Sequence, residues 1–294
     1  MTRPAGSRNI QPIHERSSIS TTSSNEIKHL ANSSESSPLN EFTTLLQHQR
    51  NFLNWIDSRH EQLLEARRNA GQKGPKDAVY RKYRWYSEQQ LLLEAVNAFE
   101  VFYKRTFIAL AEPLRRYVPP EKIKGTVDAK TLWASGRHGS LIALIFEHQL
   151  YHDLEQVDNI ANMLVGQRRY KVSDLRSPLR KRVRALQCVF QVRHTLSHNQ
   201  GYVTVSDSAK FKILGFSAKS GEVIDPAKDH LGDVIRDLLI DEAKQFTEWL
   251  LESTASHLKT YSDDRNELLP LRLKERIEQS VGNHHLIDAL DWDV

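Results

Sequence analysis

The chain has 294 residues, of which 39% are hydrophobic and 27% charged, and its mean hydropathy is −0.55. No apolar run approaches the roughly 18 residues that a membrane helix requires, and the N-terminus has no apolar signal core. We therefore expect a cytoplasmic protein with no membrane partner. The net charge of +4, from 41 basic and 37 acidic residues, permits nucleic-acid binding without requiring it.

The residue types also exclude several classes of site. A single cysteine, Cys188, cannot form an internal disulfide or a cysteine-rich zinc module. The sequence has no glycine loop that would cradle phosphates and no Gly-x-Ser-x-Gly turn. ATP-driven and serine-hydrolase activities therefore have no support, and we expect no cofactor.

The N-terminal half predicts two long helices after a polar tail. Residues 1–36 are rich in Ser, Thr and Asn, which predicts disorder because such a segment buries little apolar surface. Ser37 and Pro38 form a helix-start signal, and apolar residues then recur at helical spacing to about residue 70. A second helical pattern covers residues 77–117 and stops at Pro119-Pro120.

The middle of the chain predicts a loop and three further helices. Residues 119–138 read as a loop with a short turn, and two short helices are expected at 141–149 and 158–164. Ser177-Pro178 repeats the helix-start signal and predicts a helix that ends at residues 199–201, where Gly201 provides a left-handed stop.

The remaining elements complete an all-α prediction. Residues 202–205 and 211–216 alternate polar and apolar side chains, which predicts a short hairpin or an irregular arm. The last strong amphipathic helix follows at 230–260, and one more helix is expected at 271–281. The expected organisation is a disordered tail, one all-α helical bundle over residues 38–262 and a C-terminal extension over 263–294.

One short stretch concentrates the usable chemistry. Arg193, His194 and His198 lie at the end of the helix that Gly201 stops. On an ideal helix Arg193 and His198 are about 140° apart in rotation and roughly 7.5 Å apart along the axis, whereas His194 and His198 share a face. A long arginine side chain can still reach the rim of the helix end.

This stretch resembles a known family. Arg193-His194-Thr-Leu-Ser-His198 fits the Arg-x4-His signature of the HEPN superfamily, and Asn199-x-Gly201 resembles the ending of its RiboL-PSP-like members. The resemblance covers about residues 80–260 and implies a helical bundle of HEPN type. It also implies a metal-independent endoribonuclease, such as a toxin or antiviral effector, that binds RNA in the cleft of a homodimer. Any regulatory protein partner is unknown.

The resemblance also implies roles for single residues. Cleavage of RNA by its own 2′-hydroxyl needs proton transfer, which a histidine can provide, and stabilisation of negative charge at phosphorus, which a guanidinium can provide. We expect His198 to be the acid–base residue and Arg193 the phosphate stabiliser. The supporting residues expected are His194 and Asn199 for orientation or binding, and Glu100 before Glu94 as the anchor of Arg193.

A basic run precedes the motif helix and would attract a polyanion. Its cations outnumber its single acid, Asp174, and Tyr170 is expected to be available for stacking on bases. The RNA-binding candidates are Arg168, Arg169, Lys171, Arg176, Arg180, Lys181 and Arg184, with Arg182 in the same run. The run is equally explained as a solvated helix face. A second cluster at residues 81–86 mixes basic and aromatic side chains, and its aromatics are expected to serve the core.

Three alternatives to catalysis remain open. In the first, the domain is a non-catalytic module that binds RNA or protein through the same surface. In the second, Arg193 and His198 serve only the helix macrodipole, which favours cations at this end of a helix. A zinc pair at His194 and His198 has suitable helical spacing, but no third ligand follows at a telling distance, so we expect no metal. The direction in which Arg193 and His198 point discriminates chemistry from structure.

Overall fold

The computed structural model describes residues 37–74, 77–125, 141–147 and 149–293. Residues 37–294 form one compact unit, and its described part is mostly helical, which confirms the all-α prediction. The expected disordered tail at 1–36 and much of the loop expected at 119–138 lie outside the described residues. None of the described helices combines the length and the apolar content that crossing a membrane demands.

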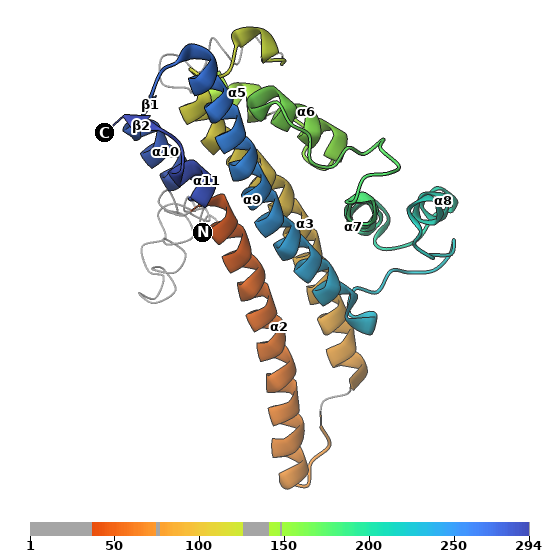
Figure 1. Cartoon of the computed structure of the whole chain (residues 1–294). Coiled ribbons are helices and arrows are strands. Elements are labelled where there is room, and N and C mark those ends of the chain that lie inside the picture. The colour runs from red at the N-terminus through yellow and green to blue at the C-terminus, as the bar shows by residue number, and fades with distance from the viewer. Residues whose placement is uncertain (1–36, 75–76, 126–140, 148, 294) are drawn as a thin grey trace, which may run out of the picture. The chain divides into compact units, whose positions relative to one another are not determined.

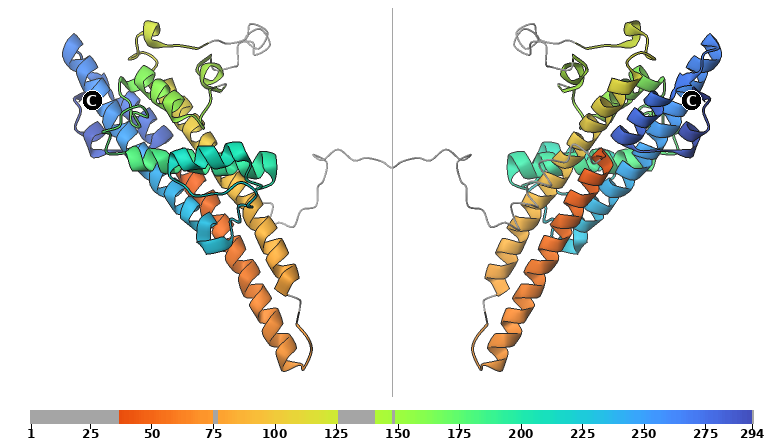
Figure 2. Two further views of the ribbon diagram at one scale, coloured as in Figure 1. Left: turned by 90° about the vertical axis from the view of Figure 1, so that its right-hand side faces the viewer. Right: turned by 90° about the vertical axis from the view of Figure 1, so that its left-hand side faces the viewer.

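Long helices form the body of the bundle. They are α2 (Pro38–Asn69), α3 (Asp77–Leu114) and α9 (Leu231–Arg265), which run side by side in Figures 1 and 2. The sequence signal at the start of α2 is confirmed, since the Ser37 hydroxyl accepts the N–H of Asn40 at 3.3 Å. In both figures, the C-terminal end of α2 and the N-terminal end of α3 extend beyond α9.

Aromatic side chains fill the space between α3 and α9. Phe102, Tyr103 and Phe107 of α3 all contact Phe246 of α9 edge-on, with ring centroids 4.8 Å apart for Tyr103. All four residues are fully buried or nearly so. Edge-to-face packing of this kind adds about 0.5–1.5 kcal/mol per pair to the burial itself. The aromatic contacts therefore fix α9 against α3.

Of the two short helices predicted in the middle of the chain, the first begins at the expected residue and the second begins earlier. α5 spans Leu141–Glu147, and after it α6 spans Leu154–Val165, starting four residues before the predicted position. The reason is Asp153, whose carboxylate accepts the N–H of Glu155 at 2.9 Å and caps the helix.

The motif helix α7 spans Arg180–Asn199 and starts later than the sequence predicts. Ser177 and Pro178 form a turn instead, in which the Ser177 carbonyl accepts the N–H of Arg180 at 3.1 Å. Figures 1 and 2 together show that α7 crosses the long helices rather than following them.

The predicted hairpin after the motif is wrong. Residues Val205–Leu214 form helix α8. A capping box explains it: the Thr204 hydroxyl accepts the N–H of Asp207, and the Asp207 carboxylate accepts the N–H of Thr204. This local signal outweighs the alternation of side chains. The described chain has an isolated antiparallel bridge here, between Tyr202 and Val223, and it is not the pairing of 202–205 with 211–216 that the sequence predicts.

The C-terminal segment joins the bundle core. After the short 3₁₀ turns η3 (Pro120–Lys122) and η5 (Lys228–His230) come β1 (Leu269–Pro270), α10 (Leu271–Val281), α11 (His285–Asp288) and β2 (Trp292–Asp293). The helix predicted at 271–281 is confirmed. α10 packs on α3 with Ile277 fully buried, and β1 pairs with β2 in parallel.

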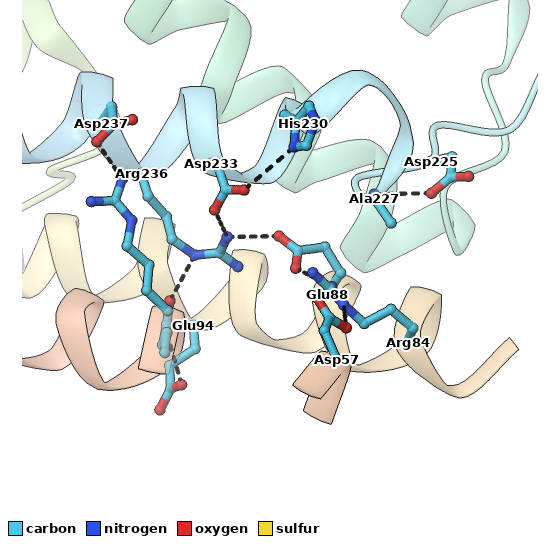
Figure 3. A network of polar contacts seen from close by, with 12 residues as sticks. Asp57, Arg84, Glu88, Glu94, Asp225, Ala227, His230, Asp233, Arg236 and Asp237 are labelled. Atoms are coloured by element: carbon cyan, nitrogen blue, oxygen red, sulfur yellow. Dashed lines mark hydrogen bonds and ion pairs between the residues drawn. The ribbon is translucent and has the colours of Figure 1, made fainter. Parts of the chain in front are cut away.

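A buried ion-pair network ties α9 to α2 and α3 (Figure 3). Arg236 of α9 is fully buried, and its Nη1 lies 2.7 Å from Glu88 of α3 and 3.3 Å from Asp233. Its Nε donates to Gln49 of α2 at 3.2 Å. Arg84 pairs with the other Glu88 oxygen at 2.7 Å. Nη2 of Arg236 is buried and has no hydrogen-bond partner among the described residues, so the set is not fully satisfied. Removing one further partner would leave an uncompensated buried charge, which is strongly destabilising.

The aromatics of the second basic cluster do not all serve the core. Tyr83 and Tyr86 are more than half exposed, at 63% and 57%, and Trp85 is half-buried. The expectation that they belong to the core is therefore wrong for both tyrosines. Tyr83 and Tyr86 are three residues apart and share a face of α3, which is not the face on which Arg84 meets α2 and Glu88 meets α9.

Candidate functional site

The sequence motif occupies the last turns of α7. The helix ends at Asn199, and Gln200 and Gly201 both take left-handed backbone angles, with φ of 51° and 85°. The N–H of Gly201 donates to the Thr195 carbonyl at 3.1 Å, which closes the helix end. The predicted stop is confirmed, and it sets the orientation of the residues before it.

Arg193 is held against α3 by an asparagine. Its Nε and Nη2 donate to Oδ1 of Asn97 at 3.1 and 3.0 Å. Nη2 also lies 4.0 Å from Glu100 Oε1. The guanidinium stays partly exposed, and Nη1 has no hydrogen-bond partner among the described residues. Arg193 therefore has a fixed position and unused donors, as a phosphate-binding arginine needs.

Glu100 links Arg193 to a histidine that the sequence reading missed. Nδ1 of His152, in the loop before α6, lies 3.4 Å from Glu100 Oε2. The His152 side chain is 47% exposed. No local sequence pattern connects residue 152 with residue 193, which is why the sequence does not indicate this contact. Arg193, Asn97, Glu100 and His152 thus form a polar cluster, which we call the Arg193 cluster.

Of the two glutamates expected near Arg193, only Glu100 lies there. Glu100 belongs to the Arg193 cluster, whereas Glu94 accepts a hydrogen bond from Gln49 of α2 at 2.9 Å. Glu94 therefore holds α2 rather than Arg193. Six residues separate the two positions on α3, which turns their side chains by about 240° around the helix.

His194 and His198 lie together on the exposed side of α7. Their ring centroids are 4.6 Å apart, and neither ring has a hydrogen-bond partner within the described ranges. Partial burial, together with the charges of His198 and Lys210, lowers the pKa of His194 below its ordinary value of 6.5. His194 is thus neutral at pH 7.

Asn199 connects the motif to α8. Its Nδ2 donates to Asp207 Oδ2 at 2.9 Å, and Gln191 Nε2 donates to Asp207 Oδ1 at 2.9 Å. Burial of Asp207 acts to raise its pKa, but the hydrogen bonds from Thr204 and Asn199 outweigh this and lower the pKa. Asp207 therefore stays ionised, and Asn199 has a structural partner.

Part of the basic run is buried. Arg169 has a side chain only 7% exposed, which pairs with the buried Glu242 at 2.9 Å, and Arg182 pairs with the same carboxylate at 3.1 Å. Tyr170 is fully buried and donates to Glu242 at 2.9 Å. The stacking role expected of Tyr170 is wrong in this fold, and Arg169 serves the core instead of an RNA surface.

The rest of the run remains on the surface. Arg168 donates to Asn159 at 3.1 Å and Arg180 to the Leu175 carbonyl at 3.0 Å, which leaves both cations without a carboxylate. The exposed cations of the run are Arg168, Lys171, Arg176, Lys181 and Arg184. These cations remain candidates for a polyanion.

The described residues contain a separate group with metal-ligating side chains. Glu248, Glu252 and His284 lie close enough to share an ion. However, His284 Nδ1 accepts the N–H of Leu286 at 3.2 Å, which places its proton on Nε2, the atom 3.7 Å from Glu252. A protonated Nε2 cannot ligate a metal, so this geometry favours a histidine–glutamate pair.

Comparisons with family models, with curated proteins and with solved structures give no match to this chain.

Proposed function

We propose that this protein is a metal-independent endoribonuclease of HEPN type that cleaves RNA at Arg193. The observation that supports this most is the fixed, partly exposed guanidinium beside Glu100, five residues before an exposed histidine on the same helix.

The proposed chemistry is an internal transfer at phosphorus. The 2′-oxygen attacks the adjacent phosphorus, a base takes its proton, and the bond to the 5′-oxygen breaks as an acid protonates that oxygen. The products are a 2′,3′-cyclic phosphate and a 5′-hydroxyl. Arg193 stabilises the charge at phosphorus, and His198 carries a proton.

The second proton carrier has two candidate sources. On an ideal helix Arg193 and His198 point about 140° apart, so a homodimer that pairs Arg193 of one copy with His198 of another would complete the site. Alternatively, His152 supplies it within one chain, because Glu100 lies between it and Arg193.

The test is RNA cleavage in EDTA. Wild type should cut, and His198→Ala should lower kcat about 10²–10⁴-fold, as expected for loss of an acid–base group. Asn97→Ala should cost about 10- to 100-fold by releasing Arg193. His152→Ala separates the two sources of the second carrier. His285→Ala, an exposed histidine elsewhere, is the control. Equal cleavage by wild type and His198→Ala would overturn the proposal.

A non-catalytic binding module is the second candidate. Exposed aromatic side chains on α2 and α3, namely Trp55, Tyr83 and Tyr86, favour contact with a partner. If wild type binds RNA or protein but cleaves no RNA in EDTA, this candidate replaces the nuclease.

A further inference from the structure

A groove of about 560 Å³ lies where the end of α3 meets the start of α10. Four arginines line it, Arg115 and Arg116 after α3 and Arg272 and Arg276 on α10, against a single glutamate, Glu112. Its volume lies within the usual range for small-molecule sites, about 300–1,000 Å³. The groove shares no residue with the Arg193 cluster.

The arginines of this groove are unlike those that hold the bundle together. Arg84, Arg169, Arg182 and Arg236 each pair with a carboxylate. Within the described chain, no hydrogen bond or ion pair joins any of the four groove arginines to another residue, and all four are exposed. Their guanidinium donors are therefore available to a ligand.

At the start of α10, the positive charges of Arg272 and Arg276 are unfavourable unless an anion is bound. The helix begins after Pro270 without a side-chain cap, and its first turn has no acidic residue. Arg272 places a cation at the positive end of the helix macrodipole, and Arg276 adds a like charge four residues later. Glu275, three residues after Arg272, offsets part of this repulsion, and an anion bound between the arginines would offset more of it.

A second groove shows that the basic lining is not general. The groove of about 360 Å³ beside the start of α9 contains Glu222, Asp225 and Asp229 against Lys228. The two grooves therefore have opposite excess charge, and the first is the one that suits an anion.

We propose that the arginine groove binds a small molecule that carries two or more phosphate groups. A guanidinium binds phosphate through two parallel hydrogen bonds, so four of them can engage adjacent phosphates. The side chains of Pro113 and Leu273 line the same groove and give it an apolar part, against which an organic portion of the ligand can lie. Along α3, this site lies roughly 20–25 Å from Asn97 and Glu100, at 1.5 Å per residue.

The test is calorimetric titration of the full chain with inorganic tripolyphosphate at low ionic strength. We expect one site per chain, and Arg272→Gln/Arg276→Gln should weaken binding at least about tenfold. Arg115→Gln/Arg116→Gln should do the same from the α3 side, which guards against a folding defect in α10. The control, Arg68→Gln/Arg81→Gln, removes the same charge from two exposed arginines elsewhere and should bind as wild type does.

Further titrations identify the source of the phosphates. ATP binding more tightly than tripolyphosphate would indicate a nucleotide, and equal binding would indicate the phosphate chain alone. The proposal is overturned if tripolyphosphate does not bind, if the control loses as much affinity as the groove variants, or if a 5′-phosphorylated RNA oligonucleotide binds through these arginines while tripolyphosphate does not. None of these readouts depends on nuclease activity, so this proposal and the nuclease proposal can fail independently.

Discussion

Arg193 illustrates how a single residue becomes suited to phosphate chemistry. Asn97 fixes it with two hydrogen bonds to one oxygen, and Glu100 supports its charge from 4.0 Å. The motif at residues 193–198 is visible in the sequence because its members are local. Asn97 and His152 were missed because each contact joins residues far apart in the chain, 96 positions for Asn97 and Arg193. Local periodicity carries no information about such contacts.

Gly232 provides a test of the buried ion-pair network at the scale of one atom. A Cβ at this position would lie 1.8 Å from Glu88 Oε1, the oxygen that pairs with Arg236. In an open helix, alanine would stabilise relative to glycine by up to about 1 kcal/mol. We predict instead that Gly232→Ala lowers the free energy of unfolding by about 3 kcal/mol or more, because it displaces a buried charge.

Urea denaturation measures this difference, and Gly166→Ala serves as its control. Gly166 has φ of +72° and no atom within 4 Å of an added Cβ, so only backbone strain of about 1–2 kcal/mol is expected. If Gly232→Ala were neutral or stabilising, the steric account of the Glu88–Arg236 pair would be wrong.

At the scale of elements, the long helices can be predicted from their apolar spacing, whereas the short helix α8 depends on a local capping signal. Apolar spacing over 30 or more residues identifies α2, α3 and α9, since no other structure satisfies it. α8 is only ten residues long, and its side-chain alternation suggested strands. The capping box at Thr204 and Asp207, a Thr-x-x-Asp pattern, was the signal that could have identified it.

Asp207 makes the link between α7 and α8 dependent on pH. Its pKa is lowered, so ionised Asp207 contributes stability above the ordinary aspartate pKa of about 3.9, and this contribution is lost as pH falls through the lower folded-state pKa. We predict that Asp207→Asn costs about 2 kcal/mol at pH 7, since an amide N–H donor replaces one of the two oxygens that accept from Gln191, Asn199 and Thr204.

The difference between wild type and Asp207→Asn should shrink as the pH falls below about 4, measured by urea denaturation from pH 7 to pH 3. Asp263→Asn, at an exposed position on α9, should show little difference at any pH. A gap for Asp207→Asn that stayed constant down to pH 3 would contradict the assignment.

The helix α10 tests whether the C-terminal segment belongs to the core. Ile277 is fully buried where α10 packs on α3. We predict that Ile277→Ala costs about 2–5 kcal/mol in thermal or urea unfolding, as for other large-to-small changes in a core. Leu286→Ala, at a site that is 41% exposed, should cost about 1 kcal/mol or less. Equal effects of the two variants would mean that α10 is peripheral.

At the scale of the whole molecule, the basic side chains divide into a buried set that pairs with carboxylates and an exposed set near α7. Buried carboxylates form ion pairs with Arg169, Arg182 and Arg236. The cations that remain on the surface, in α7 or in the segment before it, are Arg168, Lys171, Arg176, Lys181 and Arg184. The sequence predicts the cations but not their division, because burial depends on where Glu242 and Glu88 lie in the folded bundle. The surface set remains our candidate for the approach of RNA to Arg193.

The chemistry of the ends left on RNA tests the central claim most directly. After incubation with wild type in EDTA, mass spectrometry should find 2′,3′-cyclic phosphate and 5′-hydroxyl ends, and these ends should be absent with Arg193→Ala and with His198→Ala. Ends that carry a 5′-phosphate, or cyclic-phosphate ends that persist at the wild-type rate in both variants, would contradict the assignment of Arg193 and His198 to the reaction.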